Sequence, residues 1–271
     1  MKGFLRPLAF VVAVGAVAIA CAKVPYTGRL QFNLVPDGIM RGIGKSAYPQ
    51  MLKNKKVVKK GKNAETLQRV GTRIAKVADK PKFDWQFSMI KEDTVNAWCL
   101  PGGYIGFYNG ILPILSSEAG MAAVMGHEVG HATAHHGAER VSQQLALLGG
   151  LGALYLFLEE GTEMKTEHKA IIIAAAGVGA QFGIMLPFSR AHESEADVIG
   201  MMYMAQAGYT PNQSIKVWER MGELSPSKVP AFLSTHPSHE HRQKHLAKWL
   251  DQGQKKYERS KKHKGTLKAI W

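Results

Sequence analysis

The chain has 271 residues, enough for one sizeable hydrophobic core and one small additional element, which excludes an array of large domains. Its hydrophobic content of 45% is ordinary for a globular protein, but its formal net charge of +14 is not. A charge this positive favours an anionic neighbour: membrane headgroups, lipopolysaccharide, nucleic acid or acidic polypeptide.

Residues 1–20 have the pattern of a bacterial export signal. Lys2 and Arg6 precede an apolar run that is too short to span a bilayer comfortably. The run ends in Ala-Ile-Ala before Cys21, which resembles the lipobox of bacterial lipoproteins except for an alanine where leucine is usual. We therefore predict that Cys21 is lipidated and becomes the mature N-terminus. The alternative is plain signal-peptidase cleavage after the same Ala-x-Ala sequence.

The residue after Cys21 indicates the membrane. It is Ala22 and not an aspartate, which by the enterobacterial sorting rule points to the outer membrane. We expect a periplasmic protein that is lipid-anchored at the inner leaflet of the outer membrane, where it meets no nucleic acid. Cys99 then remains alone; one cysteine cannot form an internal disulfide, and we expect it in the core.

The first part of the mature chain predicts a connector and one helix. Residues 21–50 are expected to lead into a first helix, and the lysine-rich stretch 53–62 is expected to be a solvated face. Apolar residues recur at helical spacing within Ala64–Ala78, which predicts an amphipathic helix that packs on the core. These residues are Leu67, Val70, Ile74 and Val77.

Short strands are predicted next. Residues 84–90 alternate partly, as a strand does, and residues 104–108 are a second strand candidate after the turn-rich segment 96–103. We expect three short strands in this region, which would form a small antiparallel or mixed sheet. The edge strand of such a sheet could align an extended peptide by main-chain pairing.

Residues 116–140 predict a largely apolar helix that carries His127-Glu128-Val129-Gly130-His131. Four residues are about one helical turn, so His127 and His131 project from one face and can share a metal. Glu128 is offset by one residue, from which it can act as a general base without being a ligand. The pattern H-E-x-x-H predicts a zinc peptidase if a third ligand exists. The alternative is that the match to this motif is a coincidence. In that case, burying two imidazoles and a carboxylate on an apolar helix without a metal or a partner would be costly.

Two very apolar segments, Leu145–Leu158 and Ala170–Phe188, follow this helix and are separated by a charged link. Both are rich in glycine and alanine, as closely packed buried helices are. We expect buried helices or a hairpin that covers the active site. The alternative is membrane insertion, which the second, longer segment permits better than the first.

A catalytic zinc site usually has three protein ligands and an open position. Metzincins have another histidine six residues beyond the second motif histidine, but Gly137 is at that position, so this class is excluded. His135 lies one turn beyond His131, too far along a straight helix to join the same metal with ease. We expect His135 on the surface or in contact with a ligand.

The better candidate lies in Ser189–Asp197. Glu193 and Asp197 are one turn apart on a predicted helix. Glu193 could bind the metal, while Asp197 could hold the outer nitrogen of a ligating histidine. Glu195 is expected on a solvated acidic face.

The motif H-E-V-G-H together with the downstream pattern S-R-x-x-E-x-E-A-D resembles the gluzincin family that includes the HtpX, Oma-type and CAAX-prenyl proteases. The likeness runs from about Val24 to Trp249 and includes N-A-x-x-L-P-G-G at Asn96–Gly103. With a lipobox and no certain membrane span, the chain is most similar to the periplasmic lipoprotein members of the LoiP and BepA type. Unlike BepA, it has no room after residue 250 for a tetratricopeptide domain.

This resemblance implies one zinc ion per chain and hydrolysis of peptide bonds, often in misassembled envelope proteins. The ligands it implies are His127, His131 and Glu193, and it makes Glu128 the base and proton shuttle.

A further family feature is Thr235-His236-Pro237 with Arg242 six residues after the histidine. In the family this loop returns to the active site, where Arg242 could stabilise an oxyanion. His236 could act beside it, or bind zinc as a fourth ligand that substrate displaces. The alternative is a surface loop rich in histidine.

The sequence as a whole predicts an α+β, mostly α, zincin-like domain at residues 51–250, followed by a basic, mobile tail at 251–271. The tail and the lysines of 53–62 could contact anionic headgroups. The expected activity is that of a metalloendopeptidase acting on unfolded, misfolded or misassembled periplasmic and outer-membrane proteins. The competing function is a non-catalytic, zinc-stabilised chaperone or scaffold in outer-membrane protein assembly. An intact Glu128 argues against it, because structural zinc needs no base.

Overall fold

The structure is a computed structural model that describes residues 21–78, 80–180, 186–224, 232, 236, 240–263 and 267–268. The predicted signal at residues 1–20 and the side chain of Cys21 lie outside this description. The chain divides into two compact units. Unit 1 comprises Met1–Val24, Gly28–Asp37 and Gly137–Arg190, and unit 2 comprises Pro25–Thr27, Gly38–His136 and Ala191–Trp271.

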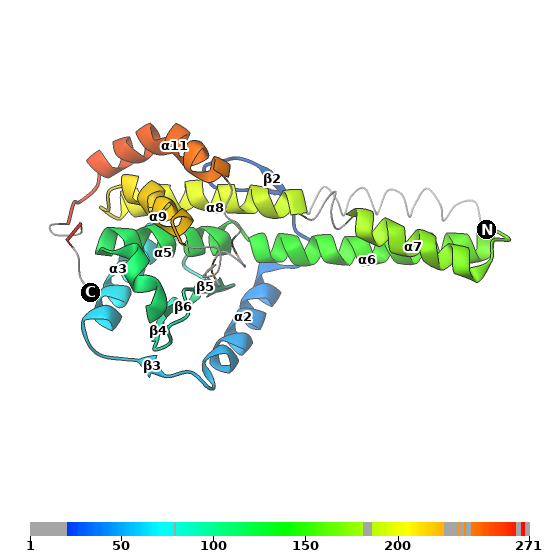
Figure 1. The fold of residues 1–271 in the computed structure, drawn as a ribbon, viewed down its shortest axis with the longest axis horizontal. Coiled ribbons are helices and arrows are strands. Elements are labelled where there is room, and N and C mark those ends of the chain that lie inside the picture. The colour runs from blue at the N-terminus through cyan, green and yellow to red at the C-terminus, as the bar shows by residue number, and fades with distance from the viewer. Residues whose placement is uncertain are drawn as a thin grey trace. The chain divides into compact units, whose positions relative to one another are not determined.

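The elements follow one another along the chain as labelled in Figure 1. In order they are β1 (Cys21–Lys23), β2 (Leu30–Phe32), α2 (Asp37–Leu52), β3 (Val57–Val58), α3 (Lys62–Ala78), β4 (Gln86–Ile90), β5 (Ala97–Leu100), β6 (Tyr104–Tyr108), the 3-10 turn η1 (Asn109–Ile111), α4 (Leu112–Leu115), α5 (Glu118–Thr133), α6 (His136–Gly161), α7 (Thr166–Ala180), α8 (Leu186–Gln206), α9 (Asn212–Gly222) and α11 (Glu240–Glu258).

Unit 2 contains a small mixed sheet with the order β3-β4-β6-β5. Strands β4 and β6 are parallel, whereas β3 pairs antiparallel with β4 and β5 pairs antiparallel with β6. The predicted α+β, mostly helical fold with a small mixed sheet is therefore confirmed. The turn-rich segment 96–103 contains the edge strand β5, because its turn is confined to the last three residues, where Gly102 and Gly103 adopt φ of 95° and 96°.

The amphipathic helix predicted at Ala64–Ala78 is confirmed as α3. Leu67, Val70 and Ile74 are fully buried, as their spacing on one helical face requires. The helix α3 packs on α5 and on β4, so it covers the sheet and supports the central helix at the same time.

Helix α5 is the buried centre of unit 2. Ser117 caps its first turn by accepting a hydrogen bond from the backbone N–H of Gly120 at 3.1 Å. Every residue from Glu118 to Gly130 is buried. The predicted continuous helix over 116–140 is wrong, because His135 adopts a left-handed φ of 56° that ends α5 before α6 starts.

Helices α5 and α8 approach each other unusually closely. A Cβ on Gly200 would lie 2.6 Å from the backbone nitrogen of His127, and one on Gly126 would lie 2.6 Å from the carbonyl oxygen of Gly200. Only glycine fits this crossing, since no real Cβ tolerates such a distance. The crossing brings the part of α8 that carries Glu193 against the face of α5 that carries the histidines.

The C-terminal part of the chain is more ordered than the sequence predicts. Residues 251–258, expected in a mobile basic tail, belong to α11, which runs from Glu240 to Glu258. Leu246 and Gly253 of this helix are buried, and α11 packs on α9. The packing of α11 on α9 therefore stabilises a segment whose composition alone suggests disorder.

In unit 1 the apolar helices are exposed. Figure 1 shows α7 beside α6, with the chain reversing direction between the two helices. Leu148 and Phe157 are each 65% exposed and Ile171 is 64% exposed, whereas Leu158 is 6% exposed. Our preferred prediction that these helices are buried is therefore wrong for most of their described residues. Among the described helices, α6 is long and apolar enough to cross a membrane, with a mean hydropathy of 1.5 over its most apolar window.

Candidate active site

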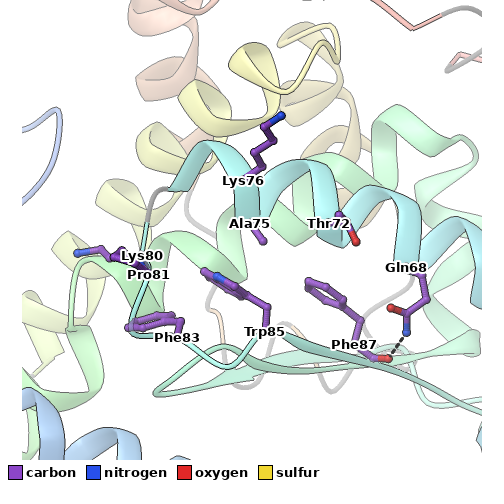
Figure 2. Close-up of a pocket in the computed structure, with 9 residues that line it drawn as sticks. All are labelled: Gln68, Thr72, Ala75, Lys76, Lys80, Pro81, Phe83, Trp85 and Phe87. Atoms are coloured by element: carbon purple, nitrogen blue, oxygen red, sulfur yellow. Dashed lines mark hydrogen bonds between the residues drawn. The ribbon is translucent and has the colours of Figure 1, made fainter.

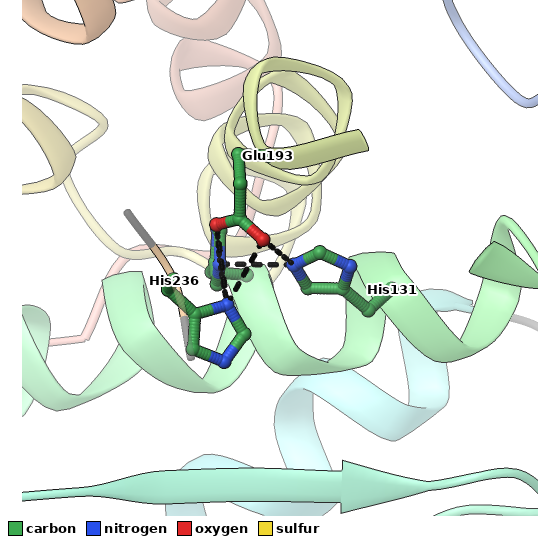
Figure 3. Close-up of side chains that lie close together, drawn as sticks. His131, Glu193 and His236 are labelled. Carbon is green, nitrogen blue, oxygen red and sulfur yellow. Dashed lines mark hydrogen bonds and ion pairs between the residues drawn. The ribbon is translucent and has the colours of Figure 1, made fainter. Parts of the chain in front are cut away.

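Four potential metal donors converge in unit 2. His127 Nε2 lies 3.1 Å from His131 Nε2 and 3.2 Å from His236 Nδ1. The carboxylate oxygens of Glu193 lie 3.3 Å from each of the two motif histidine nitrogens and 3.1 Å from His236 Nδ1. Figure 3 shows the Glu193 carboxylate of α8 facing the imidazoles of His131 and His236. Sequence elements more than 40 residues apart therefore share one small volume.

The distances between these donors fit a single tetrahedral metal ion. With metal–ligand distances of about 2.0–2.1 Å, the donors of a tetrahedral zinc site lie about 3.3 Å from one another. The observed separations of 3.1 to 3.3 Å match this value. Imidazole nitrogens and a carboxylate are also donors that zinc prefers. The residues present thus fit a zinc ion with four protein ligands.

Asp197 holds the outer nitrogen of the first histidine. Its Oδ1 lies 2.9 Å from His127 Nδ1 and also accepts a hydrogen bond from the indole N–H of Trp218. Such a carboxylate fixes the tautomer and the ring orientation of a metal-binding histidine. Burial alone would lower the pKa of His127, but hydrogen bonds to Asp197 and Glu193 outweigh it and raise the pKa to about 9.

Arg242 is fully buried and binds the carboxylates of this site. Its Nε and Nη2 donate to the two oxygens of Asp197 at 2.7 and 2.6 Å, and its Nη1 lies 3.2 Å from Glu193 Oε2. The guanidinium also lies over the ring of Trp218 at 3.5 Å. An oxyanion contact, as predicted from the sequence, would require it to leave these carboxylates. The geometry therefore favours a positioning role for Arg242.

The second motif histidine, His131, has a hydrogen-bond partner on the ring nitrogen that faces away from the other donors, and the sequence did not predict this partner. His131 Nδ1 lies 2.9 Å from His136 Nδ1, and His136 Nε2 lies 3.0 Å from Glu195 Oε2. Thr27 donates its hydroxyl to the other oxygen of Glu195. Glu195 is only 5% exposed, so its predicted position on a solvated face is wrong. A chain of hydrogen bonds thus fixes the ring of His131 as Asp197 fixes that of His127.

The spacing of the residues in the two motifs was a signal for these hydrogen bonds between His131, His136 and Glu195. Glu195 is two residues from Glu193, which turns it to the other side of α8, and His136 is five residues from His131. The contact could not be predicted because it depends on the break after α5, which brings His136 back toward the site. His135, expected on the surface or near a ligand, is half-buried at that break.

Glu195→Ala is expected to lower the zinc affinity by about 10- to 100-fold, the usual effect of losing an outer partner of a metal-binding histidine. His136 would lose its acceptor, and the ring of His131 would lose its fixed orientation. The measurement is a competition titration with a chromogenic zinc chelator. Glu219→Ala on the exposed side of α9 is the matched control and should bind zinc like the wild type. Equal affinities for both variants would contradict the assignment.

Glu128 is placed as a general base requires. It is 2% exposed, and its Oε1 has no hydrogen-bond partner among the described residues. Burial raises the pKa of this carboxyl above its usual value, which makes the carboxylate a stronger base. The nearest cationic candidate is His236, whose Nε2 lies 3.4 Å from that oxygen. Because this buried oxygen accepts no hydrogen bond from a described residue, it is available to a substrate or a water molecule.

A separate surface pocket lies between α3 and the start of β4. Figure 2 shows Phe83, Trp85 and Phe87 lining it opposite residues of α3. Its volume is about 520 Å³. None of its lining residues belongs to the metal donors or contacts them, so the pocket has no direct part in the chemistry of the site.

The fold and the site define the class of protein: a metallopeptidase in which a buried H-E-x-x-H helix and a glutamate from a second helix supply the donors. Comparison with protein families matches residues 61–250 to peptidase family M48. The chain belongs to this family, as its resemblance to the Oma- and HtpX-type proteases predicts, and it is a metallopeptidase.

Three relatives illustrate the range of similar proteins. The mitochondrial metalloendopeptidase OMA1 of Schizosaccharomyces pombe is 32% identical over 242 residues, which cover 88% of this chain and 68% of that protein. The protein of the same name in Arabidopsis thaliana is 38% identical over 163 residues, or 60% of this chain and 31% of that protein. The beta-barrel assembly-enhancing protease of Escherichia coli is 28% identical over 182 residues, or 64% of this chain and 36% of that protein.

Proposed function

We propose that the chain is a zinc endopeptidase of the bacterial cell envelope that hydrolyses peptide bonds in misfolded or misassembled periplasmic and outer-membrane proteins. The observation that carries this proposal is the convergence of His127, His131 and Glu193 beside a buried Glu128 whose Oε1 accepts no hydrogen bond from a described residue. A site that held zinc for structural support would have no use for such a base.

His127, His131 and Glu193 would hold the zinc ion, which supplies Lewis-acid polarisation of the scissile carbonyl and lowers the pKa of the attacking water. Glu128 takes the proton from that water and delivers it to the leaving amine. Asp197 and Arg242 keep the ring of His127 and the carboxylate of Glu193 in place. These buried groups also exclude bulk water, so the charges act in a medium of low polarity.

The position of the edge strand β5 favours a polypeptide as the substrate. A backbone hydrogen bond from Cys99 of β5 reaches Glu128, so this strand passes beside the base. An extended peptide that pairs with β5 would lie along the site through main-chain hydrogen bonds, which depend little on sequence. Substrates that expose extended segments are unfolded proteins, in keeping with a quality-control role. Cys99, expected in the core, is half-buried in β5, and desolvation raises the pKa of its thiol well above its usual value.

The test is direct. The purified protein is expected to contain one zinc ion per chain, measured by elemental analysis, and to cleave casein. Removal of the metal with a chelator should abolish cleavage, and added zinc should restore it. A protein that keeps its zinc, cleaves no unfolded protein and still prevents aggregation would favour the competing scaffold function.

As a fourth donor, His236 would occupy the position that a catalytic zinc site keeps open. We expect His236→Ala to raise basal casein cleavage by about 10-fold, the factor that applies if the closed form is ~90% of the population. The measurement compares initial rates at equal zinc content, with His168→Ala on the exposed part of α7 as control. An unchanged rate would rule out a latch, and a rate lowered well below the wild type would make His236 part of the catalytic machinery.

The envelope location rests on the lipobox at Cys21 and on the basic character of the chain. A lipid on Cys21 would hold the protein at a membrane, and the lysines of 53–62 and 254–268 could add attraction to anionic headgroups. Membrane fractionation of the wild type and of Cys21→Ser tests this anchor: an equal distribution of both proteins would argue for plain secretion.

A further inference from the structure

The helices α6 and α7 of unit 1 expose apolar side chains in a way that soluble helices do not. Only 11% of the most apolar 18-residue window of α6 is buried, whereas every residue of α5 from Glu118 to Gly130 is buried. Helices α5 and α6 both contain few charged residues, so composition does not explain this difference in burial. The exposed large side chains on the two helices and their turn are Leu145, Leu148, Tyr155, Leu156, Phe157, Met164, Ile171 and Ile172.

These side chains do not form one face. Successive residues of a helix are rotated by about 100°, so Leu148 and Phe157 point to roughly opposite sides of α6. Each is 65% exposed, and Leu145, which points between them, is 51% exposed. A helix that docks on a protein partner keeps a polar side toward water, whereas a helix that is apolar around its circumference suits a lipid environment.

Several polar groups at the adjoining ends of α6 and α7 pair with one another. Lys169 Nζ lies 2.8 Å from Glu159 Oε2, and Tyr155 donates its hydroxyl to the other oxygen of Glu159 at 3.1 Å. Thr162 donates its hydroxyl to the carbonyl oxygen of Leu158, which is one of the unpaired carbonyls at the helix end. Such pairing lowers the cost of placing these polar groups next to hydrocarbon, where the helix ends meet the headgroups.

The length of α6 also fits a bilayer. An 18-residue window of helix is about 27 Å long, close to the ~30 Å of the hydrocarbon core. Charged residues flank it, with the exposed Arg140 before it and Glu159 at its end. Side chains at such positions can extend to the headgroups and offset the small mismatch in length.

We propose that the α6–α7 hairpin is immersed in the hydrocarbon of a lipid bilayer, with its charged turn at headgroup level. The catalytic chain would then be held at its membrane by an insertion within its own fold, in addition to any lipid on Cys21. This places the enzyme where newly exported membrane proteins are exposed.

The test is a fluorescent probe attached at two opposite sides of α6 in the full chain. Leu148→Cys and Phe157→Cys, each made in a Cys21→Ser/Cys99→Ala background, carry the environment-sensitive dye NBD. Gln68→Cys, on the exposed side of α3, carries the same dye as the control. Casein cleavage equal to that of the parent shows that each labelled protein is folded.

With neutral phosphatidylcholine vesicles in about 1 M NaCl, where exposed charges are screened, both hairpin probes are expected to brighten severalfold and shift to shorter wavelength. Doxyl groups on the acyl chains should quench them, and the probe at residue 68 should not respond. The apolar residues 1–20 can tether the chain to vesicles, but they do not carry a probe at residue 148 or 157 into hydrocarbon.

Four outcomes would overturn the proposal. Unchanged hairpin probes on vesicles that bind the chain would show that the hairpin stays in water. A response confined to anionic phosphatidylglycerol vesicles at low salt would indicate adsorption through lysines. Bright emission without vesicles, in a protein that sediments as a dimer, would show that a second copy covers the hairpin. A response from one probe and not the other would mean one-sided contact and not immersion.

Discussion

Glu128→Gln is expected to lower the rate of casein cleavage by about 10²- to 10⁴-fold, the usual contribution of a positioned general base. The amide has the same shape as the carboxylate, but it cannot take a proton from the attacking water. Since Glu128 is not among the four donors, the variant should keep its zinc. It should also fold, because a neutral amide at this buried position carries a lower desolvation cost than a carboxylate.

The measurements are initial cleavage rates and zinc content of the same preparations. Glu65→Gln, an exposed residue of α3, controls for the change from carboxyl to amide and should leave both quantities unchanged. Residual activity of Glu128→Gln above about a tenth of the wild type would assign the base to another group. Loss of zinc together with activity would mean that Glu128 supports metal binding and not proton transfer.

The central part of this site could be predicted because it depends on local spacing. Two histidines four residues apart share one face of any α-helix, and the carboxylate between them is necessarily offset. Glu193 and Asp197 are one turn apart for the same reason. The close crossing of α5 and α8 at Gly126 and Gly200 then brings the two motifs together, as the resemblance to the family implied.

The remaining features depend on tertiary contacts or on the solvent, which spacing does not encode. The hydrogen bonds from His131 to His136 and from His136 to Glu195 require the break after α5. This break depends on a left-handed conformation at His135, which leaves no clear pattern in the sequence. The exposure of α6 and α7 was missed because apolar composition is the same for a helix in a protein core and a helix in lipid. The sequence of the amphipathic helix α3, by contrast, shows which face is buried, because its apolar residues recur at helical spacing.

Glu193→Gln is expected to lower zinc affinity by more than about 100-fold, since loss of an outer partner of a ligand already costs 10- to 100-fold. The amide would leave the metal with three neutral imidazoles, and the Arg242 guanidinium would lose one of its carboxylate partners. Cleavage should fall with zinc occupancy, which distinguishes this variant from Glu128→Gln. The measurement is a zinc competition titration between pH 6 and 9, with activity assayed at matched zinc content.

The pH dependence gives a second criterion. Zinc must displace the proton of His127, whose pKa of about 9 depends in part on its hydrogen bond to Glu193. Affinity of the wild type should therefore rise with pH up to about 9. In Glu193→Gln the pKa of His127 is expected to fall, so the rise should end at lower pH. Glu193→Asp keeps the charge and should restore part of the affinity. Full zinc occupancy of Glu193→Gln across this range would mean that three histidines suffice and that Glu193 is not a ligand.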